Sequence, residues 1–214
     1  MPFQTYLIVA AVAYLLGSIP FGFLLVLAFR QEDIRTKGSG NIGATNVVRS
    51  GAKGLGALTF LLDAVKGYVA VIAVIAAGWI LAWMGSSMPS IQNAQATAAI
   101  FAILGHMHPV WLRFKGGKGV ATAFGVFLAL SPVAALIGLA VFMVVFLIWR
   151  YVSLASIVSA VVFPIAALLL AHGQKSLLLT AVIVFVPLLV IAKHHENIAR
   201  LLQGTEYRFG KAKS

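Results

Sequence analysis

The sequence from residue 133 to residue 149 reads VAALIGLAVFMVVFLIW and contains no charged side chain. Its length is close to the about 20 apolar residues with which an α-helix crosses a lipid bilayer. Apolar and polar residues do not alternate along it, so the pattern excludes a strand of a membrane barrel. Because a helix satisfies its own backbone hydrogen bonds in hydrocarbon, we predict a membrane-spanning helix over Val133–Trp149.

Similar apolar runs lie on both sides of this one. Hydrophobic residues make up 61% of the 214 residues and charged residues 10%, whereas water-soluble domains average about 45–50% and about 25%. The composition therefore predicts an all-α integral membrane protein, with residues 1–214 forming a single polytopic domain. The seven predicted transmembrane helices are Tyr6–Phe29, Leu55–Met84, Ala94–Leu112, Val120–Leu130, Val133–Trp149, Ser153–Ala171 and Leu177–Lys193. Ser131-Pro132 separates the fourth from the fifth, because proline disfavours a helical conformation in the residue before it.

Positive charges predict the orientation of these helices. The chain has 16 Lys and Arg against 5 Asp and Glu, a formal charge of +11. Cytoplasmic loops of membrane proteins are enriched in Lys and Arg. With seven spans and the N-terminus outside, every basic residue except Lys66 and Lys175 falls on the cytoplasmic side. We therefore predict an outside N-terminus and a cytoplasmic C-terminus.

The first of three polar segments on that side, Lys37–Arg49, is rich in glycine. Glycines allow backbone N–H groups to face an anion, and the guanidinium of Arg49 matches a phosphate. No strand–helix–strand unit surrounds Gly38-x-Gly40-x-x-Gly43, so the segment is not a dinucleotide fingerprint. An anion site is favoured over a flexible helix connection, which has a similar composition. Its candidate ligands are Ser39, Gly40, Asn41, Thr45, Asn46 and Arg49.

The second segment contains Lys115, Gly116, Gly117, Lys118 and Gly119 at the predicted start of a helix. Two lysines around a glycine pair can hold a phosphate through charge and exposed N–H groups. The spacing differs from that of a Walker A loop, since a glycine rather than Ser or Thr follows Lys118. Anchoring of the loop to anionic lipid headgroups explains these residues equally well.

The third segment, His194–Glu206, follows the last predicted span. His194 and Asn197 are three residues apart and therefore share one face of a helix. A histidine can exchange protons near neutral pH or donate to a phosphate oxygen, although a polar interfacial helix would have the same pattern. Glu206 is expected to pair with a basic residue, and Ser153 either caps the sixth span or donates to a substrate.

Asp63 and Lys66 lie within the second span, three residues apart. Isolated charges are costly in the membrane, so we expect the two to pair as structural support for the site or to take part in its function. The chain has no cysteine, which excludes disulfides and thiolate nucleophiles. The sequence shows no metal site.

Taken together, these motifs resemble the bacterial membrane glycerol-3-phosphate acyltransferases that use acyl phosphate as donor. The matching stretches are GSGNIGATNVVR (38–49), LDxxKG (62–67), GHMHPVWLRFKGGKGVAT (105–122) and HxxNIxRLxxGTE (194–206). Two positions depart from the usual pattern, with His108 in place of an aromatic residue and His195 in place of arginine. The resemblance covers the whole chain in order and spacing.

The resemblance implies an enzyme of the bacterial cytoplasmic (inner) membrane that acylates the sn-1 hydroxyl of glycerol 3-phosphate to lysophosphatidic acid. It assigns Ser39, Arg49, His194 and Asn197 to catalysis, the glycine-rich second motif to glycerol 3-phosphate, and a structural role to Glu206. The expected partners are glycerol 3-phosphate, acyl phosphate, membrane lipid and the soluble enzyme that makes acyl phosphate. Neither a cofactor nor a nucleic acid is expected.

An acyl phosphate is already activated, so the enzyme needs no covalent nucleophile. It must instead hold two phosphate-bearing substrates together, which basic side chains and backbone donors can do. The hydroxyl proton can leave to His194 or to a substrate phosphate. The alternative function is an organophosphate or other anion transporter, whose binding residues would normally lie near the middle of the membrane.

Overall fold

The computed structural model describes residues 2–83, 90–171 and 173–210. Within these residues the secondary structure is helical throughout. Met84, the last residue of the second predicted span, and Lys211 and Lys213 of the basic tail lie outside the described residues. The elements are α1 (Pro2–Ser18), α2 (Phe21–Arg30), η1 (Ile34–Thr36), α3 (Ala44–Arg49), α4 (Lys53–Trp83), α5 (Ile91–Met107), η2 (Val110–Leu112), α6 (Val120–Leu130), α7 (Pro132–Trp149), α8 (Val152–Leu169), α9 (Leu177–Ala192) and α10 (His195–Leu202).

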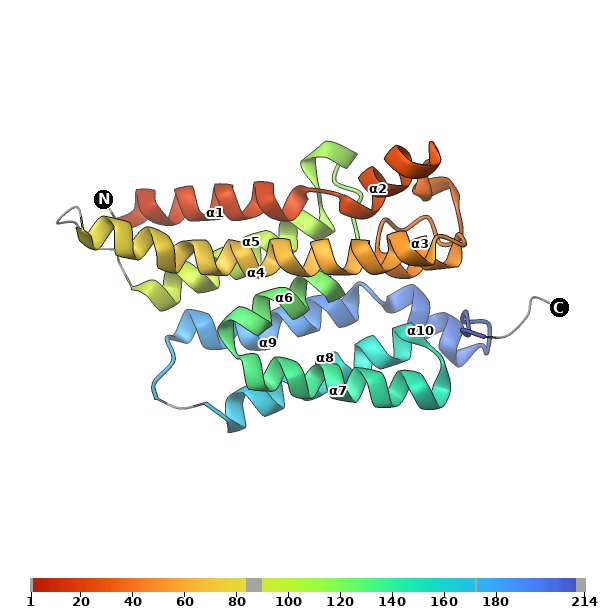
Figure 1. Cartoon of the computed structure of the whole chain (residues 1–214). Coiled ribbons are helices and arrows are strands. Elements are labelled where there is room, and N and C mark those ends of the chain that lie inside the picture. The colour runs from red at the N-terminus through yellow and green to blue at the C-terminus, as the bar shows by residue number, and fades with distance from the viewer. Residues whose placement is uncertain (1, 84–89, 172, 211–214) are drawn as a thin grey trace.

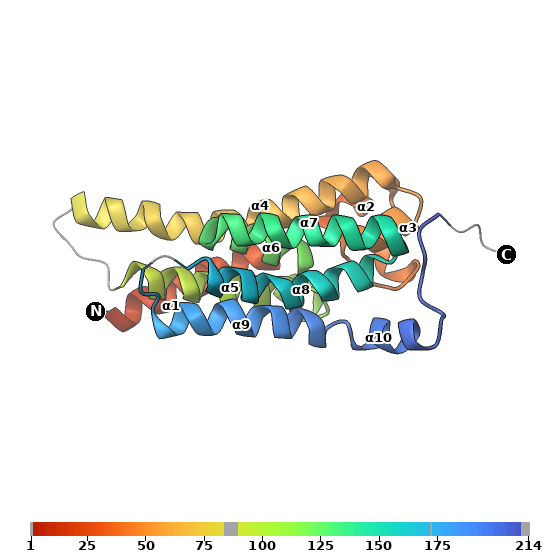
Figure 2. The ribbon, with the colours of Figure 1, turned by 90° about the horizontal axis from the view of Figure 1, so that it is seen from below.

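The long helices run side by side along one axis (Figures 1 and 2). The most extensive contacts pair α1 with α5, α4 with α6, and α7 with α8. Small residues allow these close approaches: a side chain at Gly17 would clash with the Ala102 backbone, and one at Gly125 with the Ala64 backbone. The chain begins with α1 at one end of the bundle, and α2, α3 and α10 gather at the other end (Figure 1).

Four helical stretches of the described chain are long and apolar enough to cross a membrane: Phe3–Arg30, Lys53–Ile80, Pro132–Trp149 and Val152–Leu169. A fifth would be α9 together with α10, which are bent by 54° relative to each other. The 11 residues of α6 extend over only about 16 Å at a rise of about 1.5 Å per residue, about half of the hydrocarbon thickness. The helices therefore support a multi-pass membrane protein.

Several helix ends differ from the prediction. The break between α6 and α7 at Ser131 is confirmed, and Pro132 occupies the first turn of α7. The first predicted span, however, is not one continuous helix, because α1 ends at Ser18 and α2 begins at Phe21 after Pro20. The third ends at Met107 and is followed by the short helix η2, whereas the prediction extended it to Leu112.

The break in the first span is held by the charged pair of the second span. Nζ of Lys66 lies 2.6 Å from the Asp63 carboxylate and donates a hydrogen bond of 2.7 Å to the carbonyl of Ile19. That carbonyl lies next to Pro20, where the helix is interrupted. The expected pairing is confirmed, and its partner in α5 is His106, with Nδ1 3.6 Å from Asp63. The buried cluster thus joins α4, α5 and the α1–α2 break.

Candidate active site

A cavity of about 440 Å³ lies among α3, α4, α6, α7, α8 and α9, and residues from all three polar segments line it. Its rim is polar, and its interior is mostly apolar. The polar lining includes Ser39, Asn41, Thr45, Asn46, Arg49, Lys118, Ser153, His194, Asn197 and Glu206. The three polar segments, which the sequence predicted to lie on the same side of the membrane, therefore contribute to one cavity.

Asn46 organises the first segment. Its side-chain NH₂ is within hydrogen-bonding distance of the carbonyls of Asn41 (2.8 Å), Lys37 (3.0 Å) and Ile34, and its Oδ1 accepts from the Ser39 N–H at 2.9 Å. The amide is therefore occupied in shaping the loop, although the sequence made Asn46 a candidate substrate ligand. Gly38 and Gly40 adopt left-handed backbone conformations, and Gly40 does not line the cavity.

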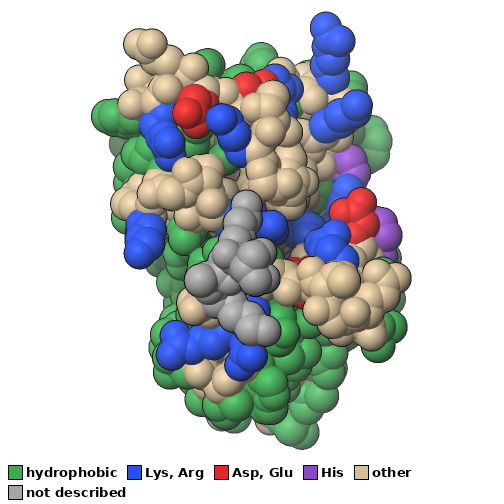
Figure 3. Space-filling model, turned by 90° about the vertical axis from the view of Figure 1, so that its right-hand side faces the viewer, with side chains coloured by type: hydrophobic (Ala, Val, Ile, Leu, Met, Phe, Trp, Pro, Cys, Tyr) green, Lys and Arg blue, Asp and Glu red, His purple; other side chains and the backbone are tan. Residues whose placement is uncertain are grey.

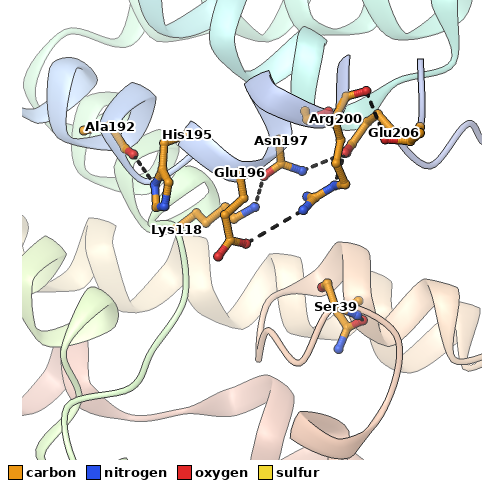
Figure 4. A network of polar contacts seen from close by, with 11 residues as sticks. Ser39, Lys118, Ala192, His195, Glu196, Asn197, Arg200 and Glu206 are labelled. Carbon is orange, nitrogen blue, oxygen red and sulfur yellow. Dashed lines mark hydrogen bonds and ion pairs between the residues drawn. The ribbon is translucent and has the colours of Figure 1, made fainter. Parts of the chain in front are cut away.

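The other candidates of this segment face the cavity. Ser39 lies on the exposed loop across from α10 (Figure 4), while Thr45 and Arg49 lie on α3. Asn41 stabilises the turn that precedes α3, since its Oδ1 accepts from the Gly43 N–H at 2.8 Å. The guanidinium carbon of Arg49 lies 4.3 Å from the centre of the Tyr207 ring.

The structure separates the residues of the second segment. Lys118 and Gly119 line the cavity, whereas Lys115 is exposed and lies outside the lining. Gly116 and Gly117 serve packing, because a side chain at either position would clash with the backbone or ring of His106. The Gly117 N–H donates to the His106 carbonyl at 3.1 Å. The glycines thus allow this loop to lie against the end of α5. This packing brings Lys118 to the cavity.

His194 and Asn197 both line the cavity, but not from one continuous helix. The last span ends at Ala192, and His194 is the N-cap residue at the bend between α9 and α10. Nδ1 of His194 donates to the Val190 carbonyl at 2.7 Å, which leaves Nε2 as a hydrogen-bond acceptor. His195 is exposed and bonds the Ala192 carbonyl instead (Figure 4).

Glu206 is the centre of a hydrogen-bond network that links the second and third segments (Figure 4). Its carboxylate accepts from Ser153 at 2.9 Å and from Asn197 and Arg200 at 2.7 Å each. Asn197 in turn accepts from Nζ of Lys118. The expected ion pair of Glu206 is confirmed with Arg200, and Ser153 is not a helix cap, because Tyr151 holds that position.

These contacts set the protonation states at the rim. Burial alone would raise the pKa of Glu206, but the hydrogen bonds from Asn197, Arg200 and Ser153 lower it overall. Burial, assisted by the charge of Arg200, lowers the pKa of Lys118. Burial also lowers the pKa of His194 to about 4, so this imidazole is neutral at physiological pH.

Basic side chains are spread over the end of the molecule that carries this rim, with hydrophobic surface along the flanks below (Figure 3). Arg49 forms no ion pair with a carboxylate of the described chain, and the carboxylates at the rim are already shared with Arg200. The rim therefore keeps positive charge available for an anionic ligand.

The apolar part of the cavity was not predicted from the sequence. It runs between α4, α6, α7 and α8, and we call it the apolar furrow; it is lined by Phe60, Phe124, Phe127, Ala135, Gly138, Leu139, Phe142, Ala160 and Phe163. The rings of Phe127 and Phe163 stack with centroids 3.9 Å apart. Tyr207 and Phe209, which follow the third motif, also line the cavity. Neither was predicted as a site residue from the sequence, although aromatic residues in an otherwise basic tail could have indicated a role at the site.

Comparison with known proteins agrees with this architecture. Residues 7–204 match the family model described as glycerol-3-phosphate acyltransferase. Curated relatives of that name include one from Syntrophotalea carbinolica, 46% identical over 96% of this chain and 98% of the relative. Another, from Trichlorobacter lovleyi, is 47% identical over 92% of this chain and 94% of the relative.

Solved structures give the same result. A crystal structure of PlsY, an integral membrane glycerol 3-phosphate acyltransferase, in its glycerol 3-phosphate form superposes with a TM-score of 0.83 at 39% identity, covering 96% of each chain. The lysophosphatidic acid form of that protein superposes with a TM-score of 0.80, covering 96% of this chain and 95% of the other. The chain belongs to the glycerol-3-phosphate acyltransferase family.

Proposed function

We propose that this protein transfers an acyl group from acyl phosphate to the sn-1 hydroxyl of glycerol 3-phosphate, releasing lysophosphatidic acid and phosphate. The observation that carries the proposal is the continuity of the cavity, whose basic rim leads directly into the apolar furrow. A phosphate group matches the rim and an acyl chain matches the furrow. The named relatives and the two ligand forms of the similar structure support the acceptor and the product.

In this proposal Arg49 and Lys118 neutralise the substrate phosphates, and the exposed Lys115 attracts anions toward the mouth from outside it. Ser39, Thr45 and Asn197 orient the hydroxyl and the acyl carbonyl, while Asn46, Ser153 and Glu206 shape the surrounding loops. Holding both substrates together converts a reaction between two repelling anions into a reaction within one complex. No covalent nucleophile or cofactor is needed, because the mixed anhydride is already activated.

The hydroxyl oxygen forms a bond to the acyl carbon as the bond from that carbon to the phosphate oxygen breaks. With a pKa of about 4, His194 is a weaker base than a phosphate monoester, whose second pKa is about 6. We therefore assign the proton to a substrate phosphate. The proton of the sn-1 hydroxyl then points to that phosphate. Neutral His194 accepts through Nε2 a hydrogen bond from the other hydroxyl of glycerol 3-phosphate and so orients the acceptor for attack.

We further propose seven membrane crossings in the bacterial inner membrane, with the N-terminus outside and the site on the cytoplasmic face. One support is the placement of Lys and Arg along the sequence. The other is that the start of α1 and α10 lie at opposite ends of the bundle (Figure 1), which requires an odd number of crossings between them. In this arrangement α6 crosses only part of the bilayer and is covered by α4 and α7. A cytoplasmic site is accessible to a soluble enzyme that makes acyl phosphate.

The donor distinguishes this proposal from its rivals. Purified protein in detergent is given glycerol 3-phosphate with palmitoyl phosphate, or with palmitoyl-CoA as control, and lysophosphatidic acid is measured by mass spectrometry. Product from palmitoyl phosphate alone is expected. Product from palmitoyl-CoA alone contradicts the donor assignment, and no product from either contradicts the acyltransferase function. The transporter alternative has no support among the named relatives, which are acyltransferases.

A further inference from the structure

The segment after α10 runs toward the ends of α3 and α7 (Figure 2), and its residues Glu206, Tyr207 and Phe209 line the cavity. It is fixed at two points. Glu206 holds one end through its bonds to Ser153, Asn197 and Arg200. At the other end the Phe209 N–H donates to the Arg150 carbonyl at 3.0 Å, and the Phe209 ring packs against Phe146 with centroids 5.6 Å apart.

Tyr207 lies between these two points. Its ring is half-buried, lines the cavity, and supports the Arg49 guanidinium, whose carbon is 4.3 Å from the ring centre. The ring of Phe209 packs edge-on against it with centroids 5.0 Å apart. The aromatic face under Arg49 is therefore positioned by the Phe209 ring and by the fixed residues Glu206 and Phe209 on either side of Tyr207 in the chain.

An aromatic support differs from an acidic one in what it leaves available. A carboxylate would neutralise the guanidinium and compete with a phosphate for its N–H groups. A ring face attracts the cation through its quadrupole and leaves the N–H groups at the edge of the guanidinium plane free to bind. Arg49 has no carboxylate partner within the described residues, so Tyr207 orients a charge that remains available to a ligand.

We propose that Tyr207 is a positioning residue that holds the guanidinium of Arg49 in the geometry required by a substrate phosphate. The inference rests on the proposed function, since it assigns a phosphate-bearing substrate to the rim. It also gives the C-terminal segment a role in substrate binding beyond the last motif of the sequence.

The test compares Tyr207→Leu, which removes the ring face, with Tyr207→Phe, which keeps it. Tyr151→Leu is the matched control, because the Tyr151 ring lies under Arg208, 5.9 Å from its guanidinium carbon, and neither residue lines the cavity. Initial rates give kcat and KM for both substrates, and thermal unfolding in detergent checks that each variant is folded.

We expect Tyr207→Leu to raise the KM for at least one of the two substrates, glycerol 3-phosphate or palmitoyl phosphate, about 5- to 20-fold. The change in kcat should be less than about twofold. Tyr207→Phe and Tyr151→Leu should retain KM values close to wild type. In an Arg49→Gln background, Tyr207→Leu should have less than about a twofold effect on the remaining activity, because the cation that the ring supports is already absent.

Unchanged KM values in a folded Tyr207→Leu protein would overturn the inference while leaving the proposed function intact. The inference also fails if Tyr207→Phe is as impaired as Tyr207→Leu, or if the full effect of Tyr207→Leu persists in the Arg49→Gln background. Wild-type protein that makes no lysophosphatidic acid overturns the proposed function and the inference with it. The wild-type measurement thus separates the two failures.

Discussion

Replacing Glu206 by glutamine tests the network that joins the second and third segments. The carboxylate accepts three hydrogen bonds at 2.9, 2.7 and 2.7 Å. Glutamine preserves the shape and can still accept from Ser153 and Asn197 through one oxygen. Its NH₂ group, however, faces the Arg200 N–H, so one charge-assisted bond is lost and two donors oppose each other.

A hydrogen bond to a charged group contributes about 1.5–3 kcal/mol. We therefore expect Glu206→Gln to lower the free energy of unfolding by about 2–3 kcal/mol, which corresponds to a fall of about 4–12 °C in Tm for a chain of this size. Because Asn197 connects Glu206 to Lys118, kcat should also fall by about tenfold or more. Thermal unfolding in detergent micelles and initial rates of lysophosphatidic acid formation measure the two effects.

Glu196→Gln is the matched control. This carboxylate also faces Arg200, but at 3.8 Å and with 69% of the side chain exposed, and such surface pairs contribute about 0–1 kcal/mol. The control should change neither Tm nor kcat appreciably. If the two variants behave alike, Glu206 does not organise the site and the reasoning from its three hydrogen bonds is wrong.

Three further predictions concern the proton, the acyl chain and the buried pair. Since the pKa of His194 is about 4, lowered from its usual 6.5, the imidazole stays neutral over pH 6–8; His194→Gln should therefore lower kcat without moving the pH profile of the rate, and a shifted profile would identify His194 as the base. Gly138→Leu places a side chain beside Ser159 and Phe163 in the furrow. Because it shortens the space for an acyl chain, it should raise the kcat/KM preference for lauroyl over palmitoyl phosphate about tenfold. An unchanged ratio would mean that the acyl chain does not occupy this part of the furrow. Lys66→Met leaves the Asp63 carboxylate buried without its cation and should lower the free energy of unfolding by about 3–5 kcal/mol. Adding Asp63→Asn should recover part of this loss. A double variant no more stable in thermal unfolding than Lys66→Met would contradict the pairing argument.

Local chemistry explains the features that were predictable from the sequence. Pro132 ends α6 through its effect on the preceding residue, whatever surrounds it. The loops at one end of the bundle could be grouped because helix parity and basic residues assign each loop to a side. Arg49, Lys118, His194 and Asn197, which this grouping put on one side, line one cavity.

Features that depend on tertiary contacts were not predictable. Pro20 is visible in the sequence, but the break beside it is stabilised by Lys66 from another helix. The glycines at 116 and 117 have the composition of a phosphate loop, yet the His106 ring and backbone determine their packing role. Asn46 could not be assigned to the loop backbone without its partners in space.

The apolar furrow was invisible for a different reason. Nearly every side chain in α6, α7 and α8 is apolar, so periodicity cannot distinguish residues that line a cavity from residues that face lipid or a neighbouring helix. Gly138 and Phe142 lie on the same helix as many lipid-compatible residues, and only the packing of α7 against α8 separates them. The tail aromatics Tyr207 and Phe209 likewise acquire their role from Arg49 and Arg150.

The central claim is that one cavity binds acyl phosphate and glycerol 3-phosphate side by side and directs the acyl group to the hydroxyl. The most direct test measures phosphate release and lysophosphatidic acid formation together in the same reaction of purified protein with palmitoyl phosphate. The account predicts equal amounts of the two products and almost no phosphate release when glycerol 3-phosphate is omitted. Phosphate release at the same rate without glycerol 3-phosphate, or release without lysophosphatidic acid, would contradict it.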